Sequence, residues 1–256
     1  MADEKLSFTD HLEELRKRLI ICLIAVGIGF SISYSFAEKI FRFLAAPLYK
    51  QLPGGSTFIF TGLTDAFFTY IKLSFFAGIF FATPVILHQF WRFVAPGLYE
   101  NEKRYTAPFI ILGTLLFIIG IAFGYYVVFP VAFKFFVSYT TDSIKILPSI
   151  KEYLSFSCMF LLAFGAIFEI PIILFFLVRM GILSEKQLRS NRKYAILLAF
   201  VAAAILTPTP DVVNQCLMAV PIIVLYEVSL VMIRLLAKKK PETAPEQSAA
   251  DSSISS

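Results

Sequence analysis

Apolar runs long enough to cross a lipid bilayer are the feature that most restricts the fold of this chain. Five runs hold 18 to 26 residues with few charges, and a transmembrane helix needs about 20. Of all residues, 58% are hydrophobic and 16% are charged, which is too apolar for an ordinary soluble domain. We expect an all-α membrane protein with six transmembrane helices, one of them short, at 19–36, 66–88, 108–129, 153–178, 194–206 and 212–233.

The distribution of lysine and arginine predicts the orientation of these helices. The two terminal segments and the loops at 92–107 and 179–193 hold 16 of the 23 basic residues, whereas the three other loops hold 6. Cytoplasmic loops carry such an excess, so we expect both chain ends in the cytoplasm. This pattern also explains the net charge of +5 without a nucleic-acid partner.

The chain divides into three expected regions. Residues 1–18 form a cytoplasmic amphipathic helix, because Phe8, Leu12 and Leu15 recur at helical spacing. Residues 19–233 form the six-helix transmembrane domain, with amphipathic helices in the outer loops. The tail at 234–256 is rich in charged residues, proline and serine, cannot bury enough apolar surface and is predicted to be disordered.

The fifth apolar run, at 194–206, is too short for an ordinary span. Its 13 residues give about 20 Å of helix, against about 30 Å of hydrocarbon, and two prolines follow it. It forms either a short true span or one half of a re-entrant hairpin. We favour the true span, because a capping box at Ser184 and Gln187 could extend the helix. A second capping box, at Ser149 and Glu152, precedes the fourth span.

Glu169 lies deep inside the fourth span, where a carboxylate costs about 2.5–3.5 kcal/mol on insertion scales. Pro171 follows two residues later and predicts a break in the helix beside the acid. The acid could be a contact point for another membrane helix or a protonatable site. The alternative is a hydrogen bond within the chain, to Asn214 or Gln215.

Other polar or small residues in the spans have simpler explanations. Glu227 lies close enough to the cytoplasmic end for Arg234 or loop cations to neutralise it, and Lys72 can extend outward along its own stem. Gly120 and Gly124 form a GxxxG pair, which is suited to close helix packing.

Two pairs of opposite charge precede the first span at helical i,i+4 spacing. Glu13 stands four residues before Lys17, and Glu14 stands four residues before Arg18. Each pair stabilises a helix by about 0.2–0.5 kcal/mol. Acids in the loop at 92–107 are either solvated side chains or ligands for a cationic group.

Several kinds of chemistry are excluded or disfavoured. The chain has two histidines, no Gly-Lys pair for a Walker A loop and no HExxH motif, so we do not expect an enzyme or a metal site. A proton-coupled transporter with Glu169 and Glu227 as carriers is an alternative, disfavoured because no internal repeat is visible. A binding and scaffold function needs no cofactor.

Five segments, taken in order, resemble the TatC family, the multispanning receptor component of the twin-arginine protein translocase. The resemblance runs from about Leu6 to about Arg234 with the same six spans. The segments that carry it are His11-Leu12-Glu13-Glu14-Leu15-Arg16-Lys17-Arg18, Pro47, Phe93-Val94-Ala95-Pro96-Gly97-Leu98-Tyr99-Glu100-Asn101-Glu102-Lys103, Phe168-Glu169-Ile170-Pro171 and Thr207-Pro208-Thr209-Pro210-Asp211.

This resemblance implies a receptor in the bacterial inner membrane that binds twin-arginine signal peptides of folded precursors at its cytoplasmic face. Its partners would be single-span TatA- and TatB-type subunits, further copies of itself and membrane lipids. Transport would be driven by the proton motive force, and no cofactor is implied.

The resemblance also implies site residues. Glu14 and Glu102 would recognise the two arginines, beside Arg16, and Phe93 and Leu98 would line the apolar side of the site. Because Glu13 and Glu100 add neighbouring acids, which member of each pair faces the arginines stays open. Partner subunits would contact Glu169, Gln215 and Leu206, while Pro47 and Asp211 would belong to the outer cap.

Overall fold

The structure is a computed structural model that describes residues 8–52, 58–94, 106–141, 147–207 and 212–237. Its regular elements are helices, and the described residues add one isolated bridge, between Ile59 and Ser149. The elements are α1 (Phe8–Ser35), α2 (Ala37–Tyr49), α3 (Asp65–Val94), α4 (Thr106–Phe123), the π-helix η3 (Gly124–Val128), α5 (Phe129–Val137), α6 (Ile150–Phe168), α7 (Ile170–Arg179), α8 (Glu185–Ser190), α9 (Arg192–Leu206) and α10 (Val212–Ala237).

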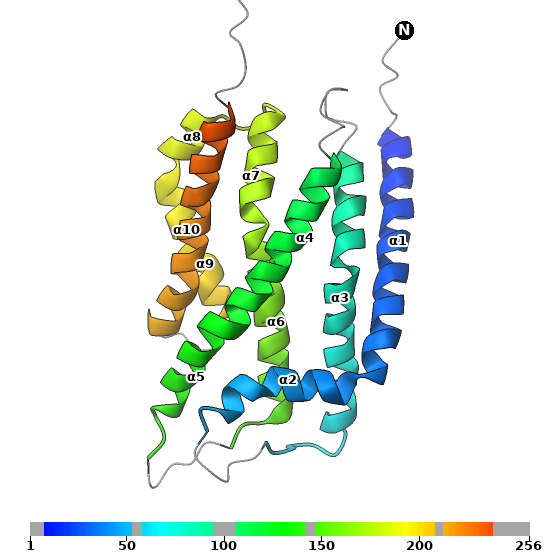
Figure 1. The fold of residues 1–256 in the computed structure, drawn as a ribbon, viewed down its shortest axis with the longest axis vertical. Coiled ribbons are helices and arrows are strands. Elements are labelled where there is room, and N and C mark those ends of the chain that lie inside the picture. Colours follow the sequence, from blue (N-terminus) through cyan, green and yellow to red (C-terminus); the bar gives the residue numbers. More distant parts are fainter. Residues whose placement is uncertain (1–7, 53–57, 95–105, 142–146, 208–211, 238–256) are drawn as a thin grey trace, which may run out of the picture.

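The helices run between two ends of a bundle (Figure 1). α1 begins and α10 ends at one end, which we name the terminal end. At the opposite end α2 lies across the bundle, so we name it the α2 end (Figure 1). α4, η3 and α5 form one continuous oblique helix, and α6 and α7 together form another long rod beside it.

The predicted all-α membrane fold is confirmed. Within the described residues, five helical stretches are long and apolar enough to cross a membrane. The remaining predicted span, the fifth, corresponds to α9, which has 15 residues and a length of about 22 Å at helical rise. The short fifth helix therefore exists, while the count of six crossings and the orientation of the chain ends stay predictions.

One of the two predicted capping boxes is wrong. Ser149 precedes α6 without a side-chain cap hydrogen bond. The first α6 amide, that of Ile150, donates to the carbonyl of Ile59 at 3.1 Å. Ser184 and Gln187 do form a capping box. They start the separate helix α8, however, which ends before Asn191, so α9 is not extended by them.

Glycines set the closest helix contacts. A Cβ atom at Gly29 of α1 would lie 2.7 Å from the carbonyl oxygen of Gly78 of α3, and a Cβ at Gly78 would lie 2.6 Å from the amide of Phe30. At Gly120 a Cβ would lie 2.6 Å from the carbonyl oxygen of Phe164 on α6. The GxxxG prediction is thus confirmed at Gly120, where the backbones approach too closely for a larger residue. At Gly124 a Cβ atom would lie 3.1 Å from the side chain of Leu161.

The predicted break in the fourth span is also confirmed. α6 ends at Phe168 and α7 begins at Ile170, with Glu169 as the joining residue and Pro171 in the first turn of α7. The proline has no amide hydrogen to continue the helical ladder. The carboxylate of Glu169, at this break, is buried inside the bundle.

Candidate functional site

A polar cluster joins α1 to α3 at the terminal end. The guanidinium of Arg18 donates from Nε to Glu14 Oε1 at 3.1 Å and also donates from Nη2 to the same oxygen. Its Nη1 lies 3.5 Å from Oε1 of Gln89, a buried residue of α3. The side chains of Arg18 and Glu14 are 13% and 28% exposed. The predicted helix pair is confirmed, and it faces the neighbouring helix.

The second predicted pair faces away from this cluster. Glu13 and Lys17 approach to 2.8 Å, with side chains that are 62% and 71% exposed. Glu14 is therefore the acid that the fold directs toward α3, while Glu13 lies on the open surface. Which of the two acids faces the arginines of a signal peptide stays a prediction.

The other predicted residues of this site are placed only in part. Arg16 is exposed on α1. Phe93 is partly buried near the end of α3, one helical turn beyond Gln89 and on the same face. Leu98 and Glu102 lie outside the described residues, as does Glu100.

Glu169 is a buried carboxylate, 6% exposed. Neither of its oxygens has a hydrogen-bond partner in the described part of the chain, so the alternative of a bond to Asn214 or Gln215 is wrong. It packs against α4 at Gly113, where a Cβ atom would lie 3.0 Å from Oε2. No group of three or more metal-ligating side chains occurs among the described residues.

The remaining predicted partner contacts lie on the hairpin of α9 and α10. Gln215 donates to the carbonyl of Phe200 at 3.1 Å, which ties the two helices together. Leu206, the last residue of α9, packs partly buried against the main hydrophobic core. Asp211 falls outside the described residues.

The simpler explanation is confirmed for Glu227, and the structure gives Lys72 a partner within the chain. Glu227 forms an ion pair with Arg192 at 2.8 Å, a loop cation as predicted. Lys72 is exposed, and its ammonium donates to the hydroxyl of Ser155 at 2.8 Å. Neither residue needs a carrier function to explain its place in a span.

Pro47 lies inside α2 and is buried. A proline removes the amide that would bond to the carbonyl four residues earlier, which here is the carbonyl of Phe43. The hydroxyl of Tyr125, in the π-helix η3, donates to that carbonyl at 2.6 Å. Tyr153 of α6 donates to the next carbonyl, that of Leu44, at 2.7 Å. The two tyrosines fix α2 across the end of the bundle.

Three residues of these clusters were not predicted from the sequence. Gln89 is a polar residue near the end of an apolar run. That position is the signal that could have marked it as a site residue. Tyr125 had a stronger signal, since a proline inside an amphipathic helix implies a free carbonyl that needs a donor. Which side chain supplies the donor depends on helices far away in the sequence.

Comparisons with known proteins agree on one family. The family model for TatC, the Sec-independent protein translocase protein, matches residues 10–221. The TatC protein of Desulforapulum autotrophicum is 50% identical over 251 residues, which cover 98% of this chain and 92% of that protein. The TatC protein of Escherichia coli K12 is 44% identical over 229 residues, which cover 90% and 88%.

A solved structure extends this agreement to three dimensions. The crystal structure of the twin-arginine translocase receptor TatC has a TM-score of 0.80 and 43% identity, covering 89% of this chain and 99% of that one. Together with the bundle of apolar helices, these matches identify a multi-pass membrane subunit that serves protein transport rather than catalysis. The chain belongs to the TatC family of twin-arginine translocase components.

Proposed function

We propose that this chain is the receptor subunit of a twin-arginine translocase and binds the signal peptides of folded precursors at the terminal end. The observation that carries the proposal is the Glu14 carboxylate, which already holds a guanidinium, that of Arg18, between α1 and α3. A site that binds one guanidinium in this way has the chemistry to bind another.

The preference for arginine follows from hydrogen-bond geometry. Guanidinium is a rigid planar group with several donors, and carboxylate accepts two of them in parallel, whereas a lysine ammonium is a compact point charge. Both donors of Arg18 reach one oxygen of Glu14, Oε1. We propose that Glu102 supplies a second carboxylate, so that two acids recognise two arginines, and that Phe93 and Leu98 contact the apolar residues that follow.

Arg18 competes with the peptide in this arrangement. Its guanidinium occupies Glu14 when the site is empty, and it also reaches Gln89. A signal-peptide arginine must displace it or use the second carboxylate oxygen. Because the pair is partly buried, its exchange costs more than that of the exposed Glu13–Lys17 pair.

The direct test is the binding of a twin-arginine signal peptide to the detergent-purified chain, compared with a twin-lysine peptide. We expect Glu14→Gln and Glu102→Gln each to weaken binding of the arginine peptide by about tenfold or more, since a charge-assisted hydrogen bond contributes about 1.5–3 kcal/mol. Glu13→Gln is the matched control and leaves binding unchanged. Equal binding of the two peptides would refute the proposed recognition.

A second proposed role is the recruitment of TatA- and TatB-type subunits at Glu169, Gln215 and Leu206. Glu169 supports it, because its carboxylate is buried without a hydrogen-bond partner among the described residues. A donor from a partner helix would relieve that cost. Since the side chain is 6% exposed, docking requires it to turn away from Gly113. Crosslinking of the partner subunits to the wild type and to Glu169→Ala tests this step. We expect fewer crosslinks of the partner subunits to the variant.

We further propose the inner membrane of a bacterium as the location, with both chain ends in the cytoplasm and the proton motive force as the energy source. The positive charge near the terminal end supports this orientation. The short α9 would thin the bilayer locally and lower the cost of moving a folded passenger. Inserting four leucines after Leu206 should then reduce transport and leave peptide binding intact; unchanged transport would contradict the thinning hypothesis.

A further inference from the structure

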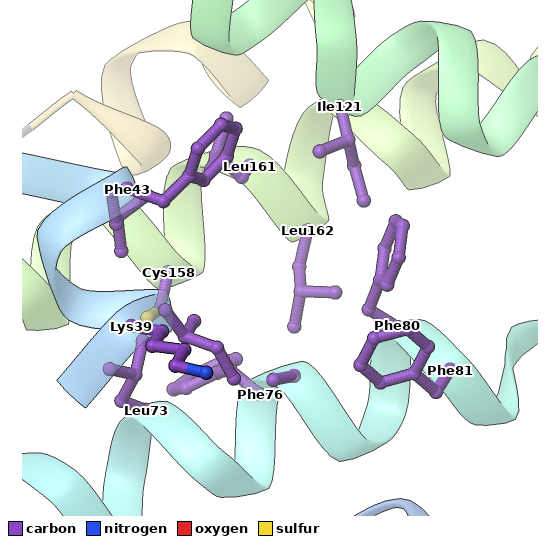
Figure 2. A pocket seen from close by; sticks show the side chains of 13 residues that line it. Lys39, Phe43, Leu73, Phe76, Phe80, Phe81, Ile121, Cys158, Leu161 and Leu162 are labelled. Carbon is purple, nitrogen blue, oxygen red and sulfur yellow. The ribbon is translucent and has the colours of Figure 1, made fainter. Parts of the chain in front are cut away.

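A cavity of about 390 Å³ lies near the α2 end of the bundle, among α2, α3, α4 and α6. Figure 2 shows its side chains pointing into a common space from these helices. The volume falls in the usual range of small-molecule sites, about 300–1,000 Å³. Its apolar walls include Phe43, Phe76, Phe80, Ile121, Leu161 and Leu162. The cavity contains neither Glu14 nor Glu169, so nothing said of it depends on the proposed receptor function.

One charged side chain, Lys39, lines this otherwise apolar cavity. Its ammonium lies 5.4 Å from the centre of the Phe36 ring. The neighbouring acid on α2, Glu38, pairs with Arg42 at 2.6 Å rather than with Lys39. Lys39 stands in the first turn of α2, directly after α1 leaves the membrane-spanning region. The cation therefore lies at the level expected for lipid headgroups.

The surroundings of the cavity determine what fills it. Its walls belong largely to helices that are long and apolar enough to cross the membrane. The cavity therefore opens toward the lipid bilayer. An empty apolar cavity forfeits dispersion contacts along its walls, and an acyl chain restores them. An ammonium at the interface attracts an anionic headgroup. We propose that this cavity binds one acyl chain of an anionic phospholipid, with the lipid phosphate beside Lys39.

The size of the cavity favours a single acyl chain over a helix from another protein. A helix with side chains is about 10 Å across, and one turn rises about 5.4 Å, so one turn fills roughly 420 Å³. A helix that spans the membrane has several such turns and needs correspondingly more space than this cavity offers. An acyl chain is narrower and extends several methylene groups into the same space.

Photocrosslinking of the full-length chain in phosphatidylcholine vesicles tests this proposal. The vesicles contain a trace of phosphatidylglycerol or phosphatidylcholine with a photoactivatable group in one acyl chain, and labelled peptides are mapped by mass spectrometry. We expect the phosphatidylglycerol probe to label residues 158–162 of the cavity wall. Lys39→Gln should reduce this labelling about fivefold, the effect of one basic residue near a lipid surface, and leave the phosphatidylcholine signal unchanged. Lys50→Gln, at the far end of α2, is the matched control.

A second variant fills the cavity. Ala77 lines it, so Ala77→Phe should abolish labelling of 158–162 by both probes, whereas Ala204→Phe, at an exposed position of α9, should not. Only variants that elute from a size-exclusion column at the same volume as the wild type are compared, so that misfolded protein is left out. Labelling that persists in Ala77→Phe would overturn the proposal, as would equal effects of Lys39→Gln on both probes. Absence of label from the cavity wall in the wild type would also overturn it and would indicate a protein occupant.

Discussion

The contact between Gly29 and Gly78 makes a sharp prediction about the packing of α1 on α3. In Gly29→Ala, the new methyl group would lie 2.7 Å from the carbonyl oxygen of Gly78 and 3.0 Å from its Cα atom. Both are backbone atoms, so no side chain can turn aside. The helices must separate, and overpacking of this kind costs about 1–3 kcal/mol.

Gly27→Ala is a nearly ideal control. It lies on the same helix, two residues earlier, and a Cβ atom there meets nothing within 4 Å. Both substitutions gain the helix propensity of alanine over glycine, about 0.8–1.0 kcal/mol. The difference between the two variants therefore isolates the steric contact, and we expect Gly29→Ala to be less stable than Gly27→Ala by about 1–3 kcal/mol.

The assay is the thermal loss of the folded monomer of purified protein in one detergent, measured side by side for the three proteins. Gly27→Ala should melt at or above the wild-type temperature, and Gly29→Ala below it. Peptide binding should weaken in Gly29→Ala alone, because separation of the helices moves Glu14 on α1 away from Phe93 on α3, the two described residues proposed to contact the peptide. Equal melting temperatures of the two variants would refute the reasoning.

Three further perturbations have distinct expected outcomes. Tyr125→Phe leaves a free carbonyl on α2 and should lower the free energy of unfolding, measured by thermal unfolding, by about 1–3 kcal/mol. The loss should be smaller in the background of Pro47→Ala, which restores the missing amide donor. Asp65→Asn removes an ion pair with Lys151 at 3.3 Å, and its small loss of stability should shrink in about 1 M salt, where the screening length is about 3 Å. Glu169→Gln should fold at least as stably as the wild type, since it removes a buried acid that lacks a partner; a large loss of stability would show that the carboxylate is paired.

Local features of the sequence determined the elements of this protein. Apolar runs located the spans, and Pro171 located the break at Glu169. The capping box at Ser184 marked a helix start, although the helix is the separate α8 and not α9. The i,i+4 spacing of Glu14 and Arg18 determined their pairing before any neighbouring helix was known. Each of these features acts within one or two turns of a helix. Over that distance the backbone geometry of the helix follows directly from the local sequence.

Contacts between distant helices were decided only by the tertiary structure. The sequence could not direct Arg18 to Gln89, place Glu169 against Gly113 or choose Tyr125 as a donor for α2. It also could not show the cavity beside Lys39. The physical reason is the solvent: lipid is as apolar as the helix surfaces, so hydropathy does not distinguish a face that meets lipid from a face that meets another helix. Glycines, prolines and buried polar groups make that choice, and their partners become known only when the helices are packed.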